Sequence, residues 1–434
     1  MRKTVALSIA ALSAISTLNA AENLSSMLTE GKASGQLRAF YIDRHYDPGT
    51  HRSAAALGGH VKYETGDLYG LSLGMAAYTT NRVFRGLEID SVDPTLFGAG
   101  GTSDTTIGEA YLQYSAGNTT LKLGRQKIDT PLAGSDDARM LPNFFEAYLA
   151  INKDIPDTTI IAGHVTKFAA GSFSNAYNGG DLGVTAGYTA IADNTARYQG
   201  EFANMGTWAV GEKTEGVSVV SGTYTGVKNL KVQVWDYYAW DILNAVYAQA
   251  DFSWKCLITD MIKPSASVQL IKENDVGDAL VVGSVDAMYW GAKLNAKVGS
   301  TNVSLAYSQT GSDTSTFGNG EILSPWGGMP AFTQGMVTRH QFLADTDAFK
   351  VAVSHDWKDM GINLKTVAYY AYFDVGSDAL YATDTTTREP GFDIQYYPEA
   401  VKNLQLRFRG NFPSDFSATG TDWDEYRFIV NYNF

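Results

Sequence analysis

The last ten residues of the chain alternate between apolar and polar side chains almost without a break. One side of this segment carries the apolar residues Tyr426, Phe428, Val430, Tyr432 and Phe434. The other side carries Glu425, Arg427, Ile429, Asn431 and Asn433. Successive side chains of a strand point to opposite faces, and about ten residues of tilted strand cross the hydrocarbon layer of a bilayer. The pattern therefore predicts a membrane-spanning strand with one face toward lipid and the other toward a water-filled lumen.

Shorter segments with the same alternation recur from Gly35 onward, with turn residues between them. The clearest lie at 71–77, 110–114, 121–123, 232–234, 246–254, 290–296, 303–307, 349–353, 392–396 and 404–408. Alternation alone does not separate a membrane barrel from a soluble sandwich, because both turn one apolar face away from a polar one.

The lengths of the connections separate these two folds. Short connections fall near 65–67, 116–118, 154–157, 225–229, 255–263, 298–301, 358–361 and 398–403. Long ones fall between them, at 80–105, 127–143, 169–216, 311–345, 374–388 and 412–422. Short turns at one end and long loops at the other are typical of a transmembrane barrel. We therefore expect an all-β, antiparallel up-and-down barrel of about 18 strands, with the weakest strand patterns near 158–168 and 217–224.

The amino-terminal residues are typical of a secretory signal peptide. A positively charged start is followed by an apolar stretch at 5–18 and by the small residues Ala20 and Ala21, where cleavage would fit. The stretch is shorter than the roughly 20 residues of a membrane-spanning helix. We expect residues 1–21 to be removed and residues 22–434 to form one barrel domain in the outer membrane of a Gram-negative bacterium.

Composition and charge narrow the function further. The chain has 25 Tyr, 20 Phe and 8 Trp but only 11 Pro, which suits a large β-protein. Its formal net charge of -13 argues against nucleic acid as a partner. The single cysteine, Cys256, cannot form an internal disulfide, so hydrogen-bonded strands must hold the fold.

The sequence predicts no enzyme, cofactor or metal. Gly70-Leu71-Ser72-Leu73-Gly74 matches a hydrolase nucleophile motif, but it lies within a β-alternation and opens no helix. The six histidines show no metal-ligand spacing, and no glycine-rich phosphate loop leads from a strand into a helix.

The connection 127–143 carries the most specific motif. It contains Asp129-Thr130-Pro131-Leu132 and then the run DDARMLPN at 136–143, with LKLGRQ at 121–126 before it and FFEA at 144–147 after it. These residues resemble the OprD-like family of outer-membrane porins, which have a similar Gly-Arg-Gln strand end, Asp-x-Arg-Met-Leu-Pro loop and Phe-Glu strand. Residues 36–41, Trp290-Gly291 and Phe434 extend the resemblance over most of the mature chain, although 170–215 looks like an insertion. The resemblance implies that the third loop, 127–143, folds inward and narrows the pore, and that wall arginines and lysines lead solutes to it.

Physical chemistry also favours a charged pore. A loop with Asp136, Asp137 and Arg139 would place opposite charges across a short gap and set a transverse field. Arginines on the lumen face of the last two strands would form a cationic track for carboxylate or phosphate groups. The alternative for each arginine is an ion pair that only stiffens the wall. We predict that the pore is lined by Arg38, Lys122, Arg125, Asp136, Asp137, Arg139, Arg407, Arg409 and Arg427.

Two of these positions depend on details of the strands. Arg38 joins the track if the first strand pairs with the last. Arg125 shares the face of Leu121 and Leu123, so it would point to lipid on a regular strand unless Gly124 forms a bulge.

The expected function is passive diffusion of small hydrophilic or charged solutes and ions through a narrow water-filled channel. The alternative is a structural or adhesive surface barrel that uses 170–215 and 311–345 as contact surfaces. Expected partners are the solutes and ions, outer-membrane lipid and the barrel-assembly machinery, whose signal Phe434 resembles. A monomer and a homotrimer both fit the sequence.

Overall fold

The structure is a computed structural model. It describes residues 21–47, 49, 51–83, 92–98, 101–176, 200–280, 284–328, 330–379, 384–416, 420 and 422–434. Apart from Ala21, the predicted signal peptide lies outside the described residues.

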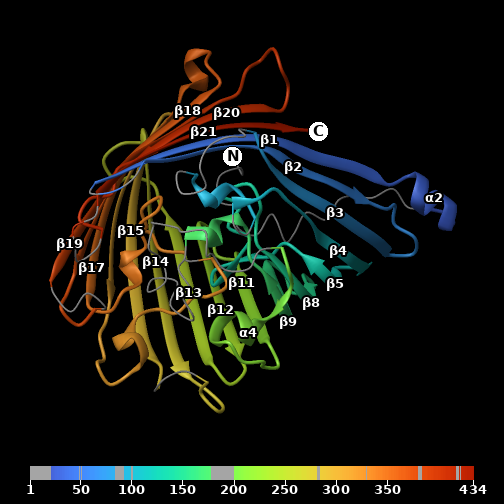
Figure 1. Cartoon of the computed structure of the whole chain (residues 1–434), viewed down its shortest axis with the longest axis horizontal. Helices are drawn as coiled ribbons and strands as arrows, with labels where there is room; N and C mark the ends of the chain where they lie inside the picture. The colour runs from blue at the N-terminus through green and yellow to red at the C-terminus, as the bar shows by residue number, and fades with distance from the viewer. Residues whose placement is uncertain are drawn as a thin grey trace.

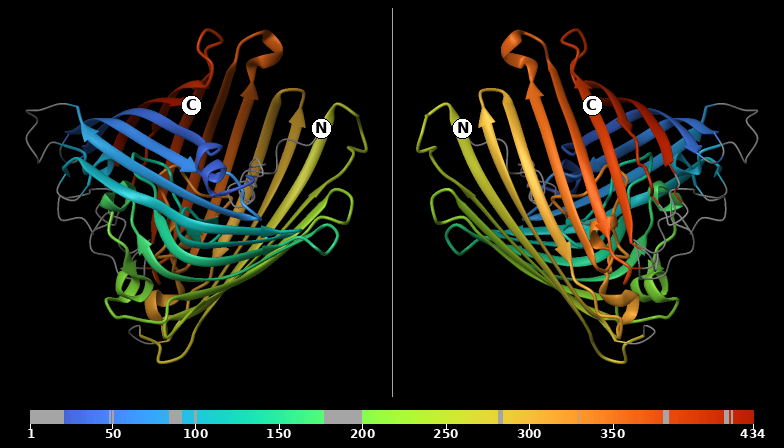
Figure 2. Two further views of the ribbon diagram at one scale, coloured as in Figure 1. Left: turned by 90° about the vertical axis from the view of Figure 1, so that its right-hand side faces the viewer. Right: turned by 90° about the vertical axis from the view of Figure 1, so that its left-hand side faces the viewer.

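Antiparallel strands form one closed sheet with a wide lumen (Figures 1 and 2). In order around the ring they are β1 (Lys32–Asp47), β2 (His51–Glu64), β3 (Leu71–Arg82), β4 (Asp104–Ala116), β5 (Thr119–Gln126), β8 (Phe144–Asn152), β9 (Thr158–Ala169), β11 (Val217–Tyr224), β12 (Leu230–Ala239), β13 (Leu243–Ser253), β14 (Ile262–Asp275), β15 (Asp286–Val298), β16 (Thr301–Thr310), β17 (Thr346–Asp356), β18 (Leu364–Val375), β19 (Thr385–Tyr396), β20 (Leu404–Asn411) and β21 (Asp422–Asn433). Of the 19 strands that the described residues place in this sheet, β10 (Ala203–Asn204) is a two-residue strand beside β9, and the other eighteen close the ring.

The barrel closes where the first strand meets the last. In Figure 1, β1 (blue) runs beside β21 (red), and the two strands pair from Gln36 with Asn433 to Asp47 with Asp422. This closure leaves no free sheet edge, which is how a β-protein satisfies its backbone in lipid. The predicted barrel of about 18 strands is confirmed, including β9 and β11, whose sequence patterns were weakest.

The alternation read from the sequence sorts side chains as expected. On β21, Tyr426 and Phe428 are exposed on the outer face, whereas Glu425 and Arg427 are buried on the lumen side. The described helices are short: α2 (Leu24–Thr29), α4 (Met205–Val210), η2 (Pro94–Leu96), η4 (Ser172–Ala176), η5 (Phe317–Gly320), η6 (His340–Phe342) and η7 (Trp357–Met360). None of the helices in the described ranges is long and apolar enough to cross a membrane.

The third loop, 127–143, folds into the lumen as predicted. It starts with a small hairpin of β6 (Asp129–Thr130) and β7 (Ala133–Gly134), where Asp129 accepts hydrogen bonds from the backbone and hydroxyl of Ser135 at 2.9 and 2.6 Å. The amide of Leu132 donates to the hydroxyl of Tyr237 on β12 at 3.4 Å. The loop therefore extends from its ends at β5 and β8 to β12.

Most of the connection 311–345 also lies inside the barrel: 320–326 and 340–344 are buried, whereas 311–315 stay largely exposed. The outer contact surface that the adhesive alternative placed on this connection is therefore mostly absent. Glu389 on β19 accepts backbone hydrogen bonds from Met336 at 2.5 Å and Thr338 at 2.7 Å. Ser308 on β16 bonds Thr333 at 2.6 Å, and Gln269 on β14 donates to the carbonyl of Pro330 at 2.9 Å. The physical reason is apolar: this connection carries many large hydrophobic side chains, and a wide lumen offers the surface that buries them. They include Ile322, Leu323, Trp326, Val337 and Phe342.

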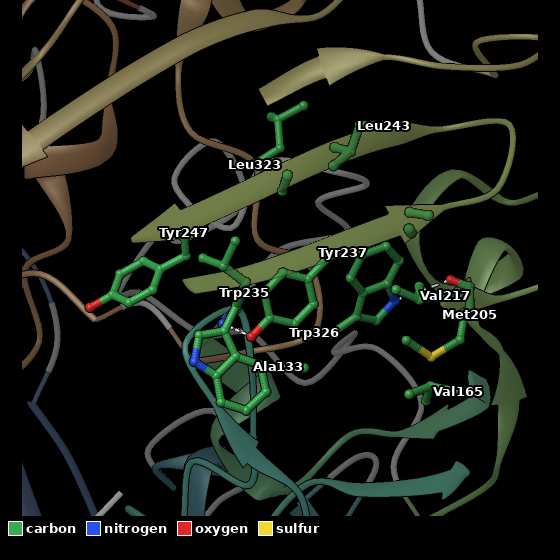
Figure 3. Packing of buried hydrophobic residues seen from close by; sticks show 14 of the residues in the cluster. Ala133, Val165, Met205, Val217, Trp235, Tyr237, Leu243, Tyr247, Leu323 and Trp326 are labelled. Carbon is green, nitrogen blue, oxygen red and sulfur yellow. Dashed lines mark hydrogen bonds between the residues drawn. The ribbon is translucent and has the colours of Figure 1, made fainter. Parts of the chain in front are cut away.

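The largest hydrophobic cluster joins this segment to the wall (Figure 3). Trp235 and Tyr237 of β12 lie with their ring centroids 6.1 Å apart. Trp326 donates its indole N–H to the carbonyl of Met205 in α4 at 3.2 Å, and the amide of Gly134 donates to the carbonyl of Trp326 at 3.2 Å. The third loop and the 311–345 segment thus support each other at the centre of the lumen.

Candidate functional site

One stretch of the lumen is lined by arginines, and we call it the arginine wall. It comprises Arg38 and Arg44 of β1, Arg407 and Arg409 of β20, Arg427 of β21, and Arg139 of the third loop. The three strands are neighbours, and the register places Arg409 opposite Arg427. Because residues two apart share a face, the pattern on each strand sends these side chains inward together.

Glu425 lies at the centre of the arginine wall and is fully buried. Its carboxylate is 2.9 Å from Nε of Arg44, 3.0 Å from Nε of Arg427 and 3.2 Å from Nη2 of Arg139. Arg44 also lies 3.2 Å from Asp93, which precedes η2. Three guanidinium groups therefore share one carboxylate. The sequence had suggested an ion pair as the alternative for each arginine, with Glu425 among the possible partners, but not that three arginines would meet one carboxylate.

A second carboxylate is shared further along the wall. Asp393 of β19 accepts from Nε of Arg407 at 2.9 Å and lies 3.6 Å from Nε of Arg409. Within the described part of the lumen, the six arginines of this wall contact four carboxylates, Asp93, Asp137, Asp393 and Glu425. The structure thus combines the cationic track with the ion pairs that the sequence offered as its alternative. Every arginine has a carboxylate nearby, yet the wall has two more arginines than carboxylates.

The two aspartates of the third loop have different surroundings. Asp137 lies 2.7 Å from Nη1 of Arg38 and 4.0 Å from Nζ of Lys127. Burial acts to raise the pKa of Asp137, but Arg38 and Lys127 outweigh it and hold the pKa below its usual range. Asp136 has a positive φ of 42°, which aspartate tolerates, and accepts from the amide of Gly328 at 3.4 Å. It therefore ties the loop to the 311–345 segment.

Arg139 does not face Asp136 and Asp137 across a gap, as the transverse-field hypothesis required. Its side chain is 1% exposed and points into the wall, where it bonds Glu425 and lies 3.3 Å from the hydroxyl of Thr95. Its carbonyl accepts a short hydrogen bond from Arg38. Arg139 thus anchors the loop to the barrel, and Asp137 is the most exposed charge of the loop.

A second set of cations lies on β2, on β5 and at the start of the third loop, and we call it the lysine wall. It comprises Lys62, Lys122 and Lys127 with Glu64, Glu109, Tyr78 and Tyr111. Lys62 is 3.3 Å from both Glu64 and Glu109. Lys122, predicted from the sequence, lies 3.9 Å from the ring centroid of Tyr111. Lys62 was missed, although it alternates with the exposed Val61 and Tyr63 and so carried the same signal.

Arg125 lies on the outer face. The register runs through Gly124 without a shift, so Arg125 pairs with Glu146 and keeps the face of Leu121 and Leu123. Its Nε is 4.0 Å from Glu146, which also contacts Lys167 at 3.0 Å. The glycine has a positive φ of 120° but forms no bulge, and the predicted inward turn does not occur.

Below the arginine wall the lumen is rich in side-chain amides. Arg38 donates from Nε to Asn431 at 2.9 Å, Asn431 to Gln405 at 2.9 Å, and Gln405 to the hydroxyl of Tyr397 at 2.8 Å. These amides line a cavity of about 570 Å³ near the short turn 397–403. The same cavity is also lined by Glu399 and Lys402, so the arginine wall leads to an amide-rich end of the lumen that carries one charge of each sign.

Comparisons with known proteins agree with this geometry. A family model described as outer membrane porin, OprD family, matches residues 27–434. Among solved structures, Pseudomonas aeruginosa OccK9 (OpdG) is 19% identical with a TM-score of 0.78. OpdK with vanillate is 17% identical with a TM-score of 0.75, and OccK2 (OpdF) in complex with glucuronate is 17% identical with a TM-score of 0.73, both from the same organism. Each match covers 94% of this chain and 99% of the other, and at these identities it shows the fold alone. No curated protein matches the chain in sequence.

Proposed function

The chain belongs to the OprD family of outer membrane porins, and from this premise we propose that it is a passive channel for small carboxylates. The family consists of channels and not of enzymes, so the finer question is which solutes pass. The proposal rests on the excess of arginine over carboxylate in the arginine wall.

Arginine suits this role because of its shape. The planar guanidinium binds a carboxylate through two parallel hydrogen bonds and stays charged at every physiological pH. Arg407 and Arg409, which share Asp393, are 28% and 15% exposed and can donate to a passing carboxylate. The three arginines around Glu425 are almost fully buried, so they act through their charge and not through direct contact with a solute. The sharing lowers the cost of exchanging one carboxylate for another, as a channel requires if solutes are to leave as well as enter.

The relatives add an observation of the same chemical class. The OpdK structure contains vanillate and the OccK2 structure contains glucuronate, and both names denote carboxylates. For this chain we infer a path along Arg409 and Arg407, past Asp137, and out through the amide-rich cavity, with the buried Arg427 adding positive charge behind the path. The arginines attract the carboxylate, the amide-rich end binds it less tightly and so favours its release, and no energy coupling is involved.

Two measurements on the purified protein test the proposal. In a planar bilayer with a salt gradient, the reversal potential should show preference for anions. In liposomes, a small sugar acid such as glucuronate should enter faster than the neutral sugar of the same size. Cation preference, or equal entry of the two solutes, would contradict the proposal.

A further inference from the structure

Two imidazoles and a carboxylate meet at the outer end of the β1–β2 hairpin. Nε2 of His51 lies 2.5 Å from Oδ1 of Asp43, and Nε2 of His45 lies 3.2 Å from Oδ2 of the same carboxylate. The two imidazole rings are stacked, with centroids 3.9 Å apart and planes at 17°. The ligand atoms of the three side chains all lie within 4.8 Å of one another.

The register of the hairpin explains this meeting. His45 and His51 are direct partners across the two strands, so both side chains point to the same face. Asp43 lies two residues before His45 and shares that face, which is the outer one because Leu37 and Tyr41 on the same parity are exposed. The spacing along the chain does not resemble a metal motif, and for this reason the sequence predicted none. The cluster forms only when the hairpin pairs.

The surroundings of the cluster favour a cation. Asp424 on β21 lies opposite His45, and Asp47 continues the same face two residues on. Both carboxylates are exposed and point to the same side as the imidazoles. The neighbouring arginines of the hairpin, Arg44 and Arg52, occupy the other face of the sheet. A cation at the cluster therefore meets negative charge on its own side of the sheet.

We propose that Asp43, His45 and His51 form a surface site for a divalent transition-metal ion such as Zn²⁺, Ni²⁺ or Cu²⁺. Imidazole nitrogen is a preferred ligand of these ions, whereas Mg²⁺ and Ca²⁺ prefer oxygen alone. Ligands that each lie about 2.0 to 2.1 Å from a tetrahedral zinc are roughly 3.3 Å apart. The imidazole and carboxylate need to separate by less than about 1 Å to reach this spacing, and the half-exposed side chains of His45 and His51 have room to do so.

A bound ion would link the outer ends of β1 and β2 beside the strand pair that closes the barrel. It would lie outside the lumen, because the lumen face of this hairpin carries Arg38, Ile42 and Arg44. The site is therefore separate from solute passage, and the two can be tested apart.

The test uses the full-length mature protein without a histidine tag, purified in detergent. Titration with ZnCl₂ in a calorimeter at pH 7.5 should show one ion per chain. The variants His51→Gln and Asp43→Asn should each weaken binding at least about tenfold, and lowering the pH to 5.5 should do the same, because the imidazoles must be neutral to bind. In the Cu²⁺-loaded protein, electron paramagnetic resonance should show nitrogen coordination.

His355 supplies the matched control. It lies on β17 and bonds Thr301 at 2.8 Å, so His355→Gln removes one partly exposed imidazole elsewhere on the barrel. This variant should bind zinc as the natural protein does. Single-channel conductance verifies that each variant is assembled, and zinc should leave that conductance unchanged. Unaltered zinc binding in an assembled His45→Gln/His51→Gln variant, or equal loss in His355→Gln, would overturn the proposal.

Discussion

On β1, β20 and β21 the cations of the lumen are arginines that share carboxylates, whereas on β2 and β5 they are lysines beside carboxylates and tyrosine rings. Glu425 contacts three arginines, but Lys62 alone contacts two glutamates, Glu64 and Glu109. The arginine wall therefore retains more positive charge for a solute. In the lysine wall the carboxylates come closer to balancing the lysines.

The third loop lies between these two walls. Asp137 contacts Arg38 of the arginine wall and Lys127 of the lysine wall, so one carboxylate interacts with cations of both walls. The difference between the walls shows that the number of basic residues alone does not determine how much positive charge a pore offers to a solute. The number of carboxylates that each cation must share decides how much charge is available.

The largest expected effect comes from removing the loop between the walls. Replacing 131–141 by a short glycine-serine link should raise single-channel conductance roughly two-fold or more, because the loop would no longer fill the part of the lumen beside the two walls. Shortening the turn at 255–260, where Leu257 and Ile258 are exposed at the short-turn end, provides the control and should leave conductance unchanged. If both deletions behave alike, the loop does not limit the pore.

The next effect concerns the stability of each wall. Glu425→Gln leaves three buried arginines without their shared carboxylate and should lower the free energy of unfolding by about 3 kcal/mol or more. Glu109→Gln should cost less, about 1 kcal/mol, because Lys62 retains Glu64. Urea unfolding in micelles, followed by tryptophan fluorescence, measures both values. Equal losses would remove the distinction between the walls.

Selectivity should follow the excess charge. Arg407→Gln/Arg409→Gln should shift the reversal potential toward cations more than Lys62→Gln/Lys122→Gln does, although each pair removes two charges. The shift should shrink at high salt, because screening over about 10 Å at 0.1 M ionic strength becomes shorter above it. A larger shift from the lysine pair would mean that solutes are guided along β2 and β5.

The smallest effect is a dependence on pH. Because Arg38 and Lys127 lower the pKa of Asp137 in the folded protein, its carboxylate should stay charged until the pH falls below about 3.9, the ordinary value for aspartate. The stabilising contact is present above that pH and is lost as the pH falls through the lower, folded pKa. Asp137→Asn should show the low-pH conductance already at pH 7. A conductance step near pH 6 that the variant abolishes would contradict this assignment.

The sequence was sufficient for what depends on a period of two. Alternation placed Arg407, Arg409 and Arg427 in the lumen, and the loop lengths indicated the barrel. What depends on pairing across strands was not readable: the three partners of Glu425 come from β1, β21 and the third loop. The register also decided that Arg125 stays outside and that His45 meets His51. Alternation within strands also does not indicate whether a long connection folds into the lumen. For this reason the burial of most of 311–345 was not predicted.

The seam between β1 and β21 has a consequence for the order of assembly. Gln36 and Asn433 are 397 residues apart and hydrogen-bonded at 2.9 Å, so the ring cannot close until β21 has been synthesised. Glu425 gains Arg44 only at that moment, and it gains Arg139 only if the third loop is already in place. Ring closure with the loop misplaced would leave a buried carboxylate short of a partner. We therefore expect β1 and β21 to separate more slowly in a barrel whose third loop is in place than in one whose loop is misplaced.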